Sequence, residues 1–360
     1  MQEWVIDDEN LSPERKSLLP GKGFFVPEDV RRETEEREIE QRVSGAERLA
    51  VVDPDADGLA CVAILRAAFG EVAFVPASPH DLAKGLERAA EFGAPDGEVY
   101  VCDLAPDDPE SIQPALDELV ERADAVTWYD HHQWTDEAVD AVEAAGVELV
   151  VGDSDEECTA DVAARSVDAE VPPQLEELAA VTRDHDLWIK EDDRSDDLAD
   201  LSQWKDPDEY LEIVEEHGVD FPESIQAFLA EKRVEKDDRI ERAVSRAELR
   251  EIRDWTVGVT YGRCSQNEVA EQLREQGADA AVIVKPAGSA SIRGSEGFER
   301  AHEVARQVNG GGHPRAAGCK PRIYDDMLDY AHHWTSRGET AKRLIMQAFW
   351  DLPEEPEAED

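Results

Sequence analysis

Short apolar runs alternate with helical stretches through the first half of the chain, and this alternation constrains its fold more than any other feature. The runs lie at 49–52, 71–76, 99–102, 125–126 and 147–151. Short, mainly apolar runs of this kind are typical of strands that are buried on both faces of a parallel sheet. We therefore expect successive βα units, whose loops at the carboxyl ends of the strands are the usual place for ligands in an open α/β sheet.

Acidic and histidine residues follow three of these runs directly. The first loop carries alternating carboxylates at Asp53, Asp55 and Asp57, the second presents Asp103, and the third presents Asp130-His131-His132. A single Asp after a strand is often only a helix cap, and one of the three acids in the first loop would suffice for that. Three alternating carboxylates on one loop would repel each other without cations, which favours a metal site.

Two further stretches of the first half carry polar groups. Asp184 and Asp186 lie in a fourth acidic cluster, which runs from Arg183 to Trp188 behind a helical stretch. Cys158-Thr159-Ala160 opens a helix after the strand at 147–151. Small and hydroxyl residues at a helix N-terminus could line a phosphate site or merely cap the helix, and the residues alone favour neither.

The second half begins with connecting segments. The stretch at 192–207 is acidic and irregular, which suits a linker or lid, and 209–249 is charged and largely helical. A second folded unit is predicted from about Trp255, with strands at 256–260, 280–284 and 289–294. The chain is therefore expected to form two lobes that a helical connector joins.

A glycine run marks the end of the second unit. Gly310, Gly311 and Gly312 are consecutive, His313 follows, and Arg293 ends a predicted strand nearby. Three glycines can present bare backbone N–H groups to an anion, with the two cationic side chains as charge-assisted partners. We therefore favour phosphate or substrate binding here over a flexible linker.

The formal charge of −49, from 86 acidic against 37 basic residues, is extreme and spread along the whole chain. Molar salt would screen such a surface, so the charge indicates a salt-adapted, halophilic cytoplasm. A disordered acidic protein is the alternative, but 41% hydrophobic residues and eight tryptophans favour a folded chain. The acidity does not exclude a polyanionic substrate, because metals and a few arginines could hold it.

Other sequence signals bear on the compartment. No apolar run approaches membrane-spanning length, and the first ten residues have neither a basic flank nor a hydrophobic region. The five cysteines lie far apart without a CxxC pair, so buried reduced thiols are expected rather than a zinc site or disulfides. We therefore expect a cytoplasmic protein with no membrane partner.

The four clusters in this order, together with Gly-Gly-Gly-His-x-x-Ala-Ala-Gly at 310–318, resemble the DHH phosphoesterase superfamily, and most closely its RecJ-like nuclease and oligonucleotide phosphodiesterase branch. The resemblance covers roughly residues 47 to 320. It implies an α/β fold, with a doubly wound parallel sheet that holds two divalent metals, usually Mn²⁺ with Mg²⁺ as the alternative. A helical linker then leads to a smaller α/β C-terminal lobe. The expected parts are an N-terminal extension with a charged helix (1–44), a DHH catalytic domain (45–205), a helical linker (206–250), a substrate-binding domain (251–345) and an acidic tail (346–360).

The resemblance also implies roles for individual residues. The implied metal ligands are Asp55, Asp57, Asp103 as the bridging carboxylate, His131 and Asp184. Asp184 is preferred because it keeps the motif's spacing to Trp188, and Asp186 is the competing choice. His132 would face the scissile phosphate, and Asp130 would hold a ligand by a hydrogen bond. The implied substrate-binding residues are Arg293, Gly310, Gly311, Gly312 and His313.

One position departs from the family's pattern. The first motif commonly begins with a metal-binding His, and this chain has Val51 there. We expect Asp53 to replace that ligand from within the same loop, which would give an oxygen-rich site suited to Mn²⁺ or Mg²⁺. The other interpretation is that one metal site is weak and catalysis is partly lost.

The expected function is that of a metal-dependent phosphodiesterase, a RecJ-like exonuclease. Its implied substrates are single-stranded DNA or RNA, or short oligonucleotides, which a water molecule activated by two metals would cleave. One alternative is a phosphoesterase for small substrates, namely cyclic dinucleotides, phosphoadenosine phosphate or pyrophosphate. Another is a non-catalytic scaffold, and replication or repair proteins are candidate partners in either case.

Overall fold

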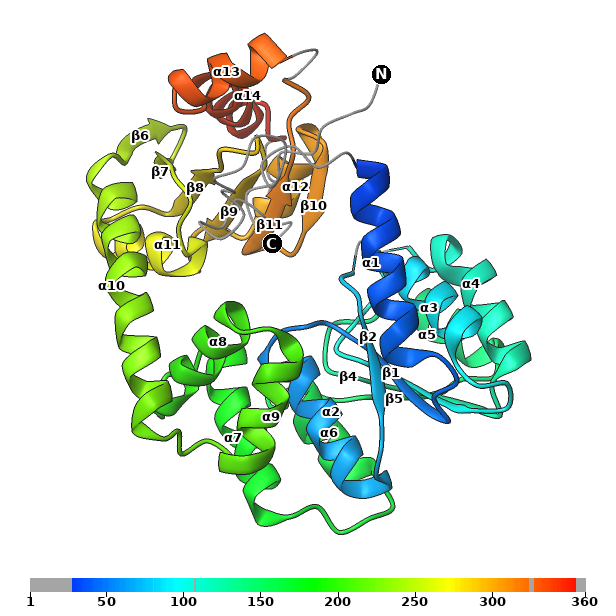
Figure 1. The fold of residues 1–360 in the computed structure, drawn as a ribbon. Coiled ribbons are helices and arrows are strands. Elements are labelled where there is room, and N and C mark those ends of the chain that lie inside the picture. The colour runs from blue at the N-terminus through cyan, green and yellow to red at the C-terminus, as the bar shows by residue number, and fades with distance from the viewer. Residues whose placement is uncertain (1–27, 80, 107, 324–326, 354–360) are drawn as a thin grey trace, which may run out of the picture. The chain divides into compact units, whose positions relative to one another are not determined.

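The computed structural model describes residues 28–79, 81–106, 108–323 and 327–353 of the chain. The expected N-terminal extension before residue 28 and most of the expected acidic tail lie outside these residues. The chain forms two compact units, one from Asp29 to Leu229 and one that begins at Ala230. Each unit has its own sheet (Figure 1).

The first unit is built on a five-stranded sheet in the order β2-β1-β3-β4-β5, with all neighbours parallel. Its strands are β1 (Arg48–Val52), β2 (Ala73–Pro76), β3 (Glu98–Cys102), β4 (Ala125–Asp130) and β5 (Glu148–Val151). This order means that the chain leaves β1 toward one edge, returns, and continues from β3 toward the other edge. The predicted parallel, doubly wound sheet is therefore confirmed, and its switch point lies between β1 and β3, where ligand sites form in such sheets.

Helices cover both faces of this sheet (Figure 1). They are α1 (Glu28–Val43), α2 (Ala56–Phe69), α3 (Leu82–Phe92), α4 (Pro109–Arg122), α5 (Asp136–Ala144), α6 (Thr159–Ser166), α7 (Pro173–Asp186), α8 (Arg194–Trp204) and α9 (Pro207–His217). Alternate residues of a strand point to opposite faces. Ala50 and Val52 of β1 accordingly pack in the core beneath α2, α6 and α7, while Leu49 and Val51 pack in the core beneath α1, α3 and α4.

Helices at both ends of the first unit are tied into it. Arg88 of α3 is buried and donates to Glu35 at 2.7 Å and to Glu36 at 2.9 Å, which fastens α1 to α3. Tyr210 and Leu211 of α9 are fully buried in the core that contains α2. The unit thus takes in α1 and α9, which the sequence analysis left outside the catalytic domain.

The stretch at 192–207, predicted to be irregular, is largely the helix α8, and that prediction was wrong. Leu198 and Leu201 of α8 are fully buried. These two residues stand three apart, which places them on one helix face. Asp193 and Asp196 are exposed, whereas Asp200 is buried beside the leucines.

The second unit contains a six-stranded mixed sheet in the order β10-β11-β9-β8-β7-β6, in which β7 and β8 are parallel and the other neighbours are antiparallel. Its strands are β6 (Glu248–Ile252), β7 (Trp255–Tyr261), β8 (Ala280–Val284), β9 (Ala290–Gly294), β10 (Gly310–Gly312) and β11 (Ala316–Cys319). Its helices are α11 (Gln266–Glu275), α12 (Ala301–Gln307), α13 (Met327–Thr335) and α14 (Glu339–Trp350). The long helix α10 (Glu223–Ser245) runs from the first unit into the second. A smaller α/β lobe was expected here and is present.

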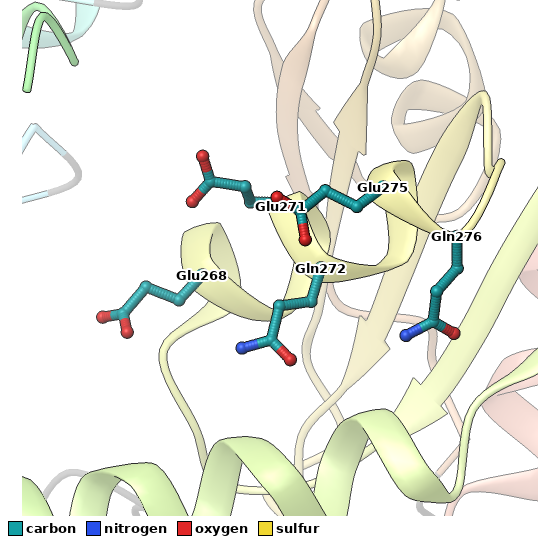
Figure 2. Close-up of a pocket in the computed structure, with 5 residues that line it drawn as sticks. All are labelled: Glu268, Glu271, Gln272, Glu275 and Gln276. Atoms are coloured by element: carbon teal, nitrogen blue, oxygen red, sulfur yellow. The ribbon is translucent and has the colours of Figure 1, made fainter.

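The outer face of α11 is acidic. Glu268, Glu271, Gln272, Glu275 and Gln276 line a hollow there (Figure 2). Lys236 of α10 pairs with Glu268 at 2.7 Å and neutralises part of this charge. Because its lining side chains are carboxylates and amides, this hollow does not suit a phosphate-bearing ligand. No helix among the described residues combines the length and the apolar character that a membrane span needs.

Candidate active site

The loop after β1 is shaped by Asp55 and Gly58. One oxygen of the Asp55 side chain accepts hydrogen bonds from the backbone N–H groups of Asp57 (3.0 Å) and Gly58 (3.1 Å), so Asp55 is the N-cap of α2. A Cβ at Gly58 would collide with the carbonyl oxygen of Asp53, which explains the glycine. Asp55 itself is exposed, whereas Asp57, in the first turn of α2, is buried.

Asp57 is held by the start of α6. Its two carboxylate oxygens accept hydrogen bonds from the backbone N–H of Thr159 at 2.7 Å and of Ala160 at 2.8 Å. Burial raises the pKa of Asp57, and the nearby Asp55 adds to this rise, while His131 and the two backbone donors oppose it. The backbone N–H groups of Thr159 and Ala160 at the start of α6 therefore bind a carboxylate of the protein. They are not available to a free phosphate, which was one of the two roles that the sequence allowed for this segment.

Asp103 follows β3 in a left-handed conformation, with φ of +62°. Few residues other than glycine adopt this region easily, although Asp and Asn are among those that do. The side chain is buried, and the hydroxyl of Thr159 donates to its Oδ1 at 3.0 Å. Burial raises the pKa of Asp103 well above its usual range, and the carboxylates of Asp57, Asp55 and Asp186 raise it further.

The end of β4 places Asp130 and His132 in direct contact. Asp130 is fully buried and accepts hydrogen bonds from Nδ1 of His132 at 2.7 Å, from the indole of Trp134 at 2.6 Å and from the backbone of His131 at 2.9 Å. Burial would raise the pKa of Asp130, but the His132 and Trp134 hydrogen bonds outweigh it, so the pKa is lowered. Burial in turn lowers the pKa of His132, but Asp130 outweighs this and raises it to about 9. Asp130 and His132 therefore form an ion pair at neutral pH.

His131 lies at the centre of the cluster. Its Nε2 is 3.2 Å from Oδ2 of Asp186 and 3.8 Å from Oδ1 of Asp103. Among the described residues, two sets of three side chains could each hold a metal ion, because the potential ligand atoms within a set all lie within 4.8 Å of one another. One set is Asp57, His131 and Asp186, and the other is Asp103, His131 and His132. Nδ1 of His131 is buried and has no hydrogen-bond partner in the described part of the chain. The first turn of α2, the loops after β3 and β4, and the end of α7 thus bring their ligand-type side chains to one place.

The structure brings Asp186 to this cluster and does not bring Asp184 there. Successive helix residues are about 100° apart, so two acids separated by two positions point in nearly opposite directions. The Asp184 carboxylate faces the loop after α7, where it accepts the backbone N–H of Glu191 at 2.8 Å. Burial raises the pKa of Asp184, but hydrogen bonds, including that of Glu191, lower it below its usual value. Burial and the carboxylates of Asp57 and Asp55 raise the pKa of Asp186 to about 8.

Val51 is a core residue. Its side chain is fully buried beneath α3, and a Cβ added at Gly85 would already press on it at 3.0 Å. Asp53, two residues later, lies in the loop, where burial and the neighbouring Asp55 raise its pKa to about 8 and His132 acts in the opposite direction. Asp53 therefore lies near the cluster, although its oxygens are not in either close group of ligand atoms.

The second unit contains the predicted substrate-binding residues. Gly310 to Gly312 do not form a loop: they are the edge strand β10, which pairs with β11. A side chain at Gly310 would collide with the carbonyl oxygen of Gly318, so close strand pairing requires glycine there. His313 has an exposed side chain, and its backbone N–H donates to Ala316 at 2.8 Å. The Nε of Arg293 donates to the side chain of Asn267 at 2.8 Å.

Sequence reasoning missed the contacts that hold the cluster together. Thr159 was noted only as part of a possible phosphate site or helix cap, and Trp134, which binds Asp130, carried no signal that could be recognised. Asp186 was considered but ranked second. In the structure Trp134 also packs edge-on against Trp128, at 5.3 Å between ring centres.

Comparisons with known proteins establish the fold. No protein-family model matches the chain, and no curated protein matches it either. Among solved structures, RecJ from Thermus thermophilus in complex with Mn²⁺ is 16% identical with a TM-score of 0.56, over 89% of this chain and 55% of that one. PggH from Vibrio cholerae, a pGpG-specific phosphodiesterase, is 12% identical with a TM-score of 0.51, over 85% of this chain and 100% of that one. The chain thus shares its fold with these two proteins, and it spans little more than half of the RecJ structure.

Proposed function

We propose that this chain is a metal-dependent phosphoesterase of the DHH type that hydrolyses phosphodiester bonds in single-stranded nucleic acid or short oligonucleotides. The observation that carries the proposal is the gathering of Asp57, Asp103, His131 and Asp186 from four separate elements near the switch point of the sheet. The likeness of fold to RecJ and to a pGpG phosphodiesterase supports it.

The residues of the cluster fit divalent cations. Carboxylates with pKa values raised by burial and by one another are costly without a positive charge among them. The unpartnered, buried Nδ1 of His131 also indicates a group that the protein alone does not satisfy. Carboxylate and imidazole donors suit Mn²⁺, with Mg²⁺ as the alternative. Two such ions would supply Lewis-acid polarisation of the phosphate and a lowered pKa for the attacking water.

His132 and Asp130 would bind the substrate phosphate. Because Nδ1 of His132 donates to Asp130, Nε2 is the nitrogen that remains for a phosphate oxygen. Despite burial, the hydrogen bond to Asp130 raises the pKa of His132, and in its protonated form the imidazole can donate a charge-assisted hydrogen bond to the phosphate. Trp134 holds the other oxygen of Asp130 and so fixes the orientation of the pair. These residues would orient the phosphate and stabilise charge that develops on it.

The second unit contains further candidate binding residues. We propose Arg293, Gly310, Gly311, Gly312 and His313 as the groups that hold a phosphate or a terminal nucleotide. Gly311 supports this proposal because a Cβ there would meet no other atom within 4 Å, so its backbone is open to a ligand. His313 is exposed and can supply a hydrogen bond next to it.

A small dinucleotide substrate is the second candidate. The chain covers 100% of the PggH structure but only 55% of the RecJ structure. The likeness of fold to PggH, whose substrate pGpG is a dinucleotide, supports this candidate. A substrate of two nucleotides should therefore be compared directly with longer strands.

The substrate class can be tested with DNA and RNA oligonucleotides of two to twenty nucleotides, labelled at the 5′ or the 3′ end, in Mn²⁺ and molar salt. We expect release of mononucleotides. Comparing the turnover of strands of different length identifies the preferred length, and comparing the 5′-labelled with the 3′-labelled strands identifies the polarity of digestion. Preference for the dinucleotide would favour the second candidate. Absence of hydrolysis of these strands and of cyclic dinucleotides, with either Mn²⁺ or Mg²⁺, would overturn the proposal and favour a non-catalytic scaffold.

Asp53 is proposed to complete the metal site in place of the missing histidine at position 51. Asp53→Asn should weaken Mn²⁺ binding roughly 10-fold or more, because it removes one charged oxygen donor from the loop. Asp81→Asn is the matched control, since it removes a charge that also acts on Asp53 without being a proposed ligand. Calorimetric titration of both metal-free variants with Mn²⁺ measures this. Wild-type affinity in Asp53→Asn would show that the site is complete without Asp53.

A further inference from the structure

Thr159 is the residue through which two acids of the cluster are connected. Its backbone N–H donates to Oδ2 of Asp57 at 2.7 Å, and its hydroxyl donates to Oδ1 of Asp103 at 3.0 Å. The residue is fully buried. Asp57 comes from the first turn of α2 and Asp103 from the loop after β3, so one residue of α6 contacts side chains that two different elements deliver.

The hydroxyl of Thr159 is not needed to cap its own helix. The carboxylate of Asp161 accepts the backbone N–H of Cys158 at 3.1 Å and closes the first turn of α6. Arg183 of α7 donates to the same Asp161 side chain at 3.0 Å, which fastens this turn to the neighbouring helix. The start of α6 is therefore fixed without the Thr159 side chain, and its hydroxyl is free to serve Asp103.

The hydrogen bond has a definite direction when Asp103 is ionised. A carboxylate is only an acceptor, so the hydroxyl of Thr159 must be the donor. That bond engages one oxygen of Asp103 and sets the rotation of its carboxylate plane. Hydrogen bonds of this kind orient the side chains that bind a metal, and losing them typically lowers metal affinity or activity about 10–100-fold.

We propose that Thr159 is a positioning residue that sets the Asp103 carboxylate, through its hydroxyl, in the orientation needed to bind a divalent cation together with Asp57. This inference rests on the proposed metal-dependent function and adds a residue to it. It also gives the Cys158-Thr159-Ala160 segment a role that is neither helix capping nor phosphate binding.

Two substitutions separate positioning from packing. Thr159→Val keeps the shape and removes the hydroxyl, while both backbone donors to Asp57 stay in place. Thr159→Ser keeps the hydroxyl and removes a buried methyl group. Positioning predicts that the valine variant loses about 10–100-fold in Mn²⁺ affinity, whereas the serine variant retains an affinity close to that of the wild type. A packing role predicts the reverse order, with the larger effect in the serine variant.

The matched control is Thr182→Val. Thr182 is a buried threonine of α7 whose hydroxyl has no hydrogen-bond partner in the described part of the chain, so its loss should leave Mn²⁺ affinity unchanged. Calorimetric titration of the metal-free proteins with Mn²⁺ measures all four affinities without reference to activity. If the wild type binds Mn²⁺ and Thr159→Val binds it equally well, the role of Thr159 is disproved while the proposed function stands. If the wild type binds no Mn²⁺, both fail.

Discussion

Asp103→Asn is expected to lower hydrolysis about 1,000-fold or more. Metal ions contribute several kcal/mol of charge stabilisation in such reactions, and each tenfold change in rate corresponds to about 1.4 kcal/mol. Asparagine has nearly the same shape, tolerates the left-handed backbone at φ of +62°, and can still accept the hydroxyl of Thr159. The substitution therefore removes the charge and leaves the local structure in place. Measuring kcat at saturating Mn²⁺, together with Mn²⁺ affinity, tests this directly.

The same substitution, Asp103→Asn, should increase the stability of the metal-free protein although it lowers activity. Burial and the neighbouring carboxylates raise the pKa of Asp103, which means that its ionised form is unfavourable in the metal-free protein. Removing this charge should therefore raise the unfolding temperature of the metal-free protein and reduce the further increase that Mn²⁺ produces. Asp153→Asn is the control, because Asp153 is an exposed acid shortly after β5 and is outside the cluster. Wild-type turnover and Mn²⁺ affinity in Asp103→Asn would exclude Asp103 as a ligand.

The fold of the first unit could be predicted because its signals are local. Each parallel strand is a short apolar run, such as 49–52 or 99–102, and the acid that follows it marks the carboxyl end. Since parallel strands end at the same edge, the meeting of Asp57, Asp103 and His131 followed from the order of elements alone. This reasoning needed no knowledge of side-chain rotamers or of contacts distant in sequence.

The contacts that orient the ligands could not be predicted in this way. Thr159 donates to Asp57 across 102 residues, and nothing near either residue signals the pair. The role of Gly310 to Gly312 also depends on a distant partner, since they become a strand only by pairing with β11. The helix within 192–207 was missed for another reason, because the many acids of this segment obscured the two buried leucines of α8.

The choice between Asp184 and Asp186 shows how spacing can mislead. Asp184 and Trp188 stand four residues apart, which is the spacing of neighbours on one helix face. However, α7 ends at Asp186, and Trp188 lies beyond it with φ of +57°, so the helical spacing no longer applies. Asp186 is the last residue of the helix and faces His131 at 3.2 Å.

Asp186→Asn and Asp184→Asn should therefore have different effects. In Asp186→Asn we expect Mn²⁺ affinity and kcat to fall about 100-fold, because a charged oxygen next to His131 is lost. In Asp184→Asn we expect near wild-type Mn²⁺ affinity and a free energy of unfolding lowered by about 1 kcal/mol. The Asn side-chain oxygen can still accept the backbone N–H of Glu191, so the variant loses only the part of this hydrogen bond that the charge contributes.

The two variants control for each other, since both change an Asp to Asn within one turn of α7. Calorimetric Mn²⁺ titration measures the first effect and urea denaturation of the metal-free protein measures the second. A loss of Mn²⁺ affinity confined to Asp184→Asn would show that Asp184, the residue that the motif spacing favours, is the metal ligand. Equal losses in both variants would mean that the end of α7 acts as one structural element. Loss in Asp186→Asn alone would establish that the direction of a side chain at a helix end, rather than motif spacing, selects the ligand.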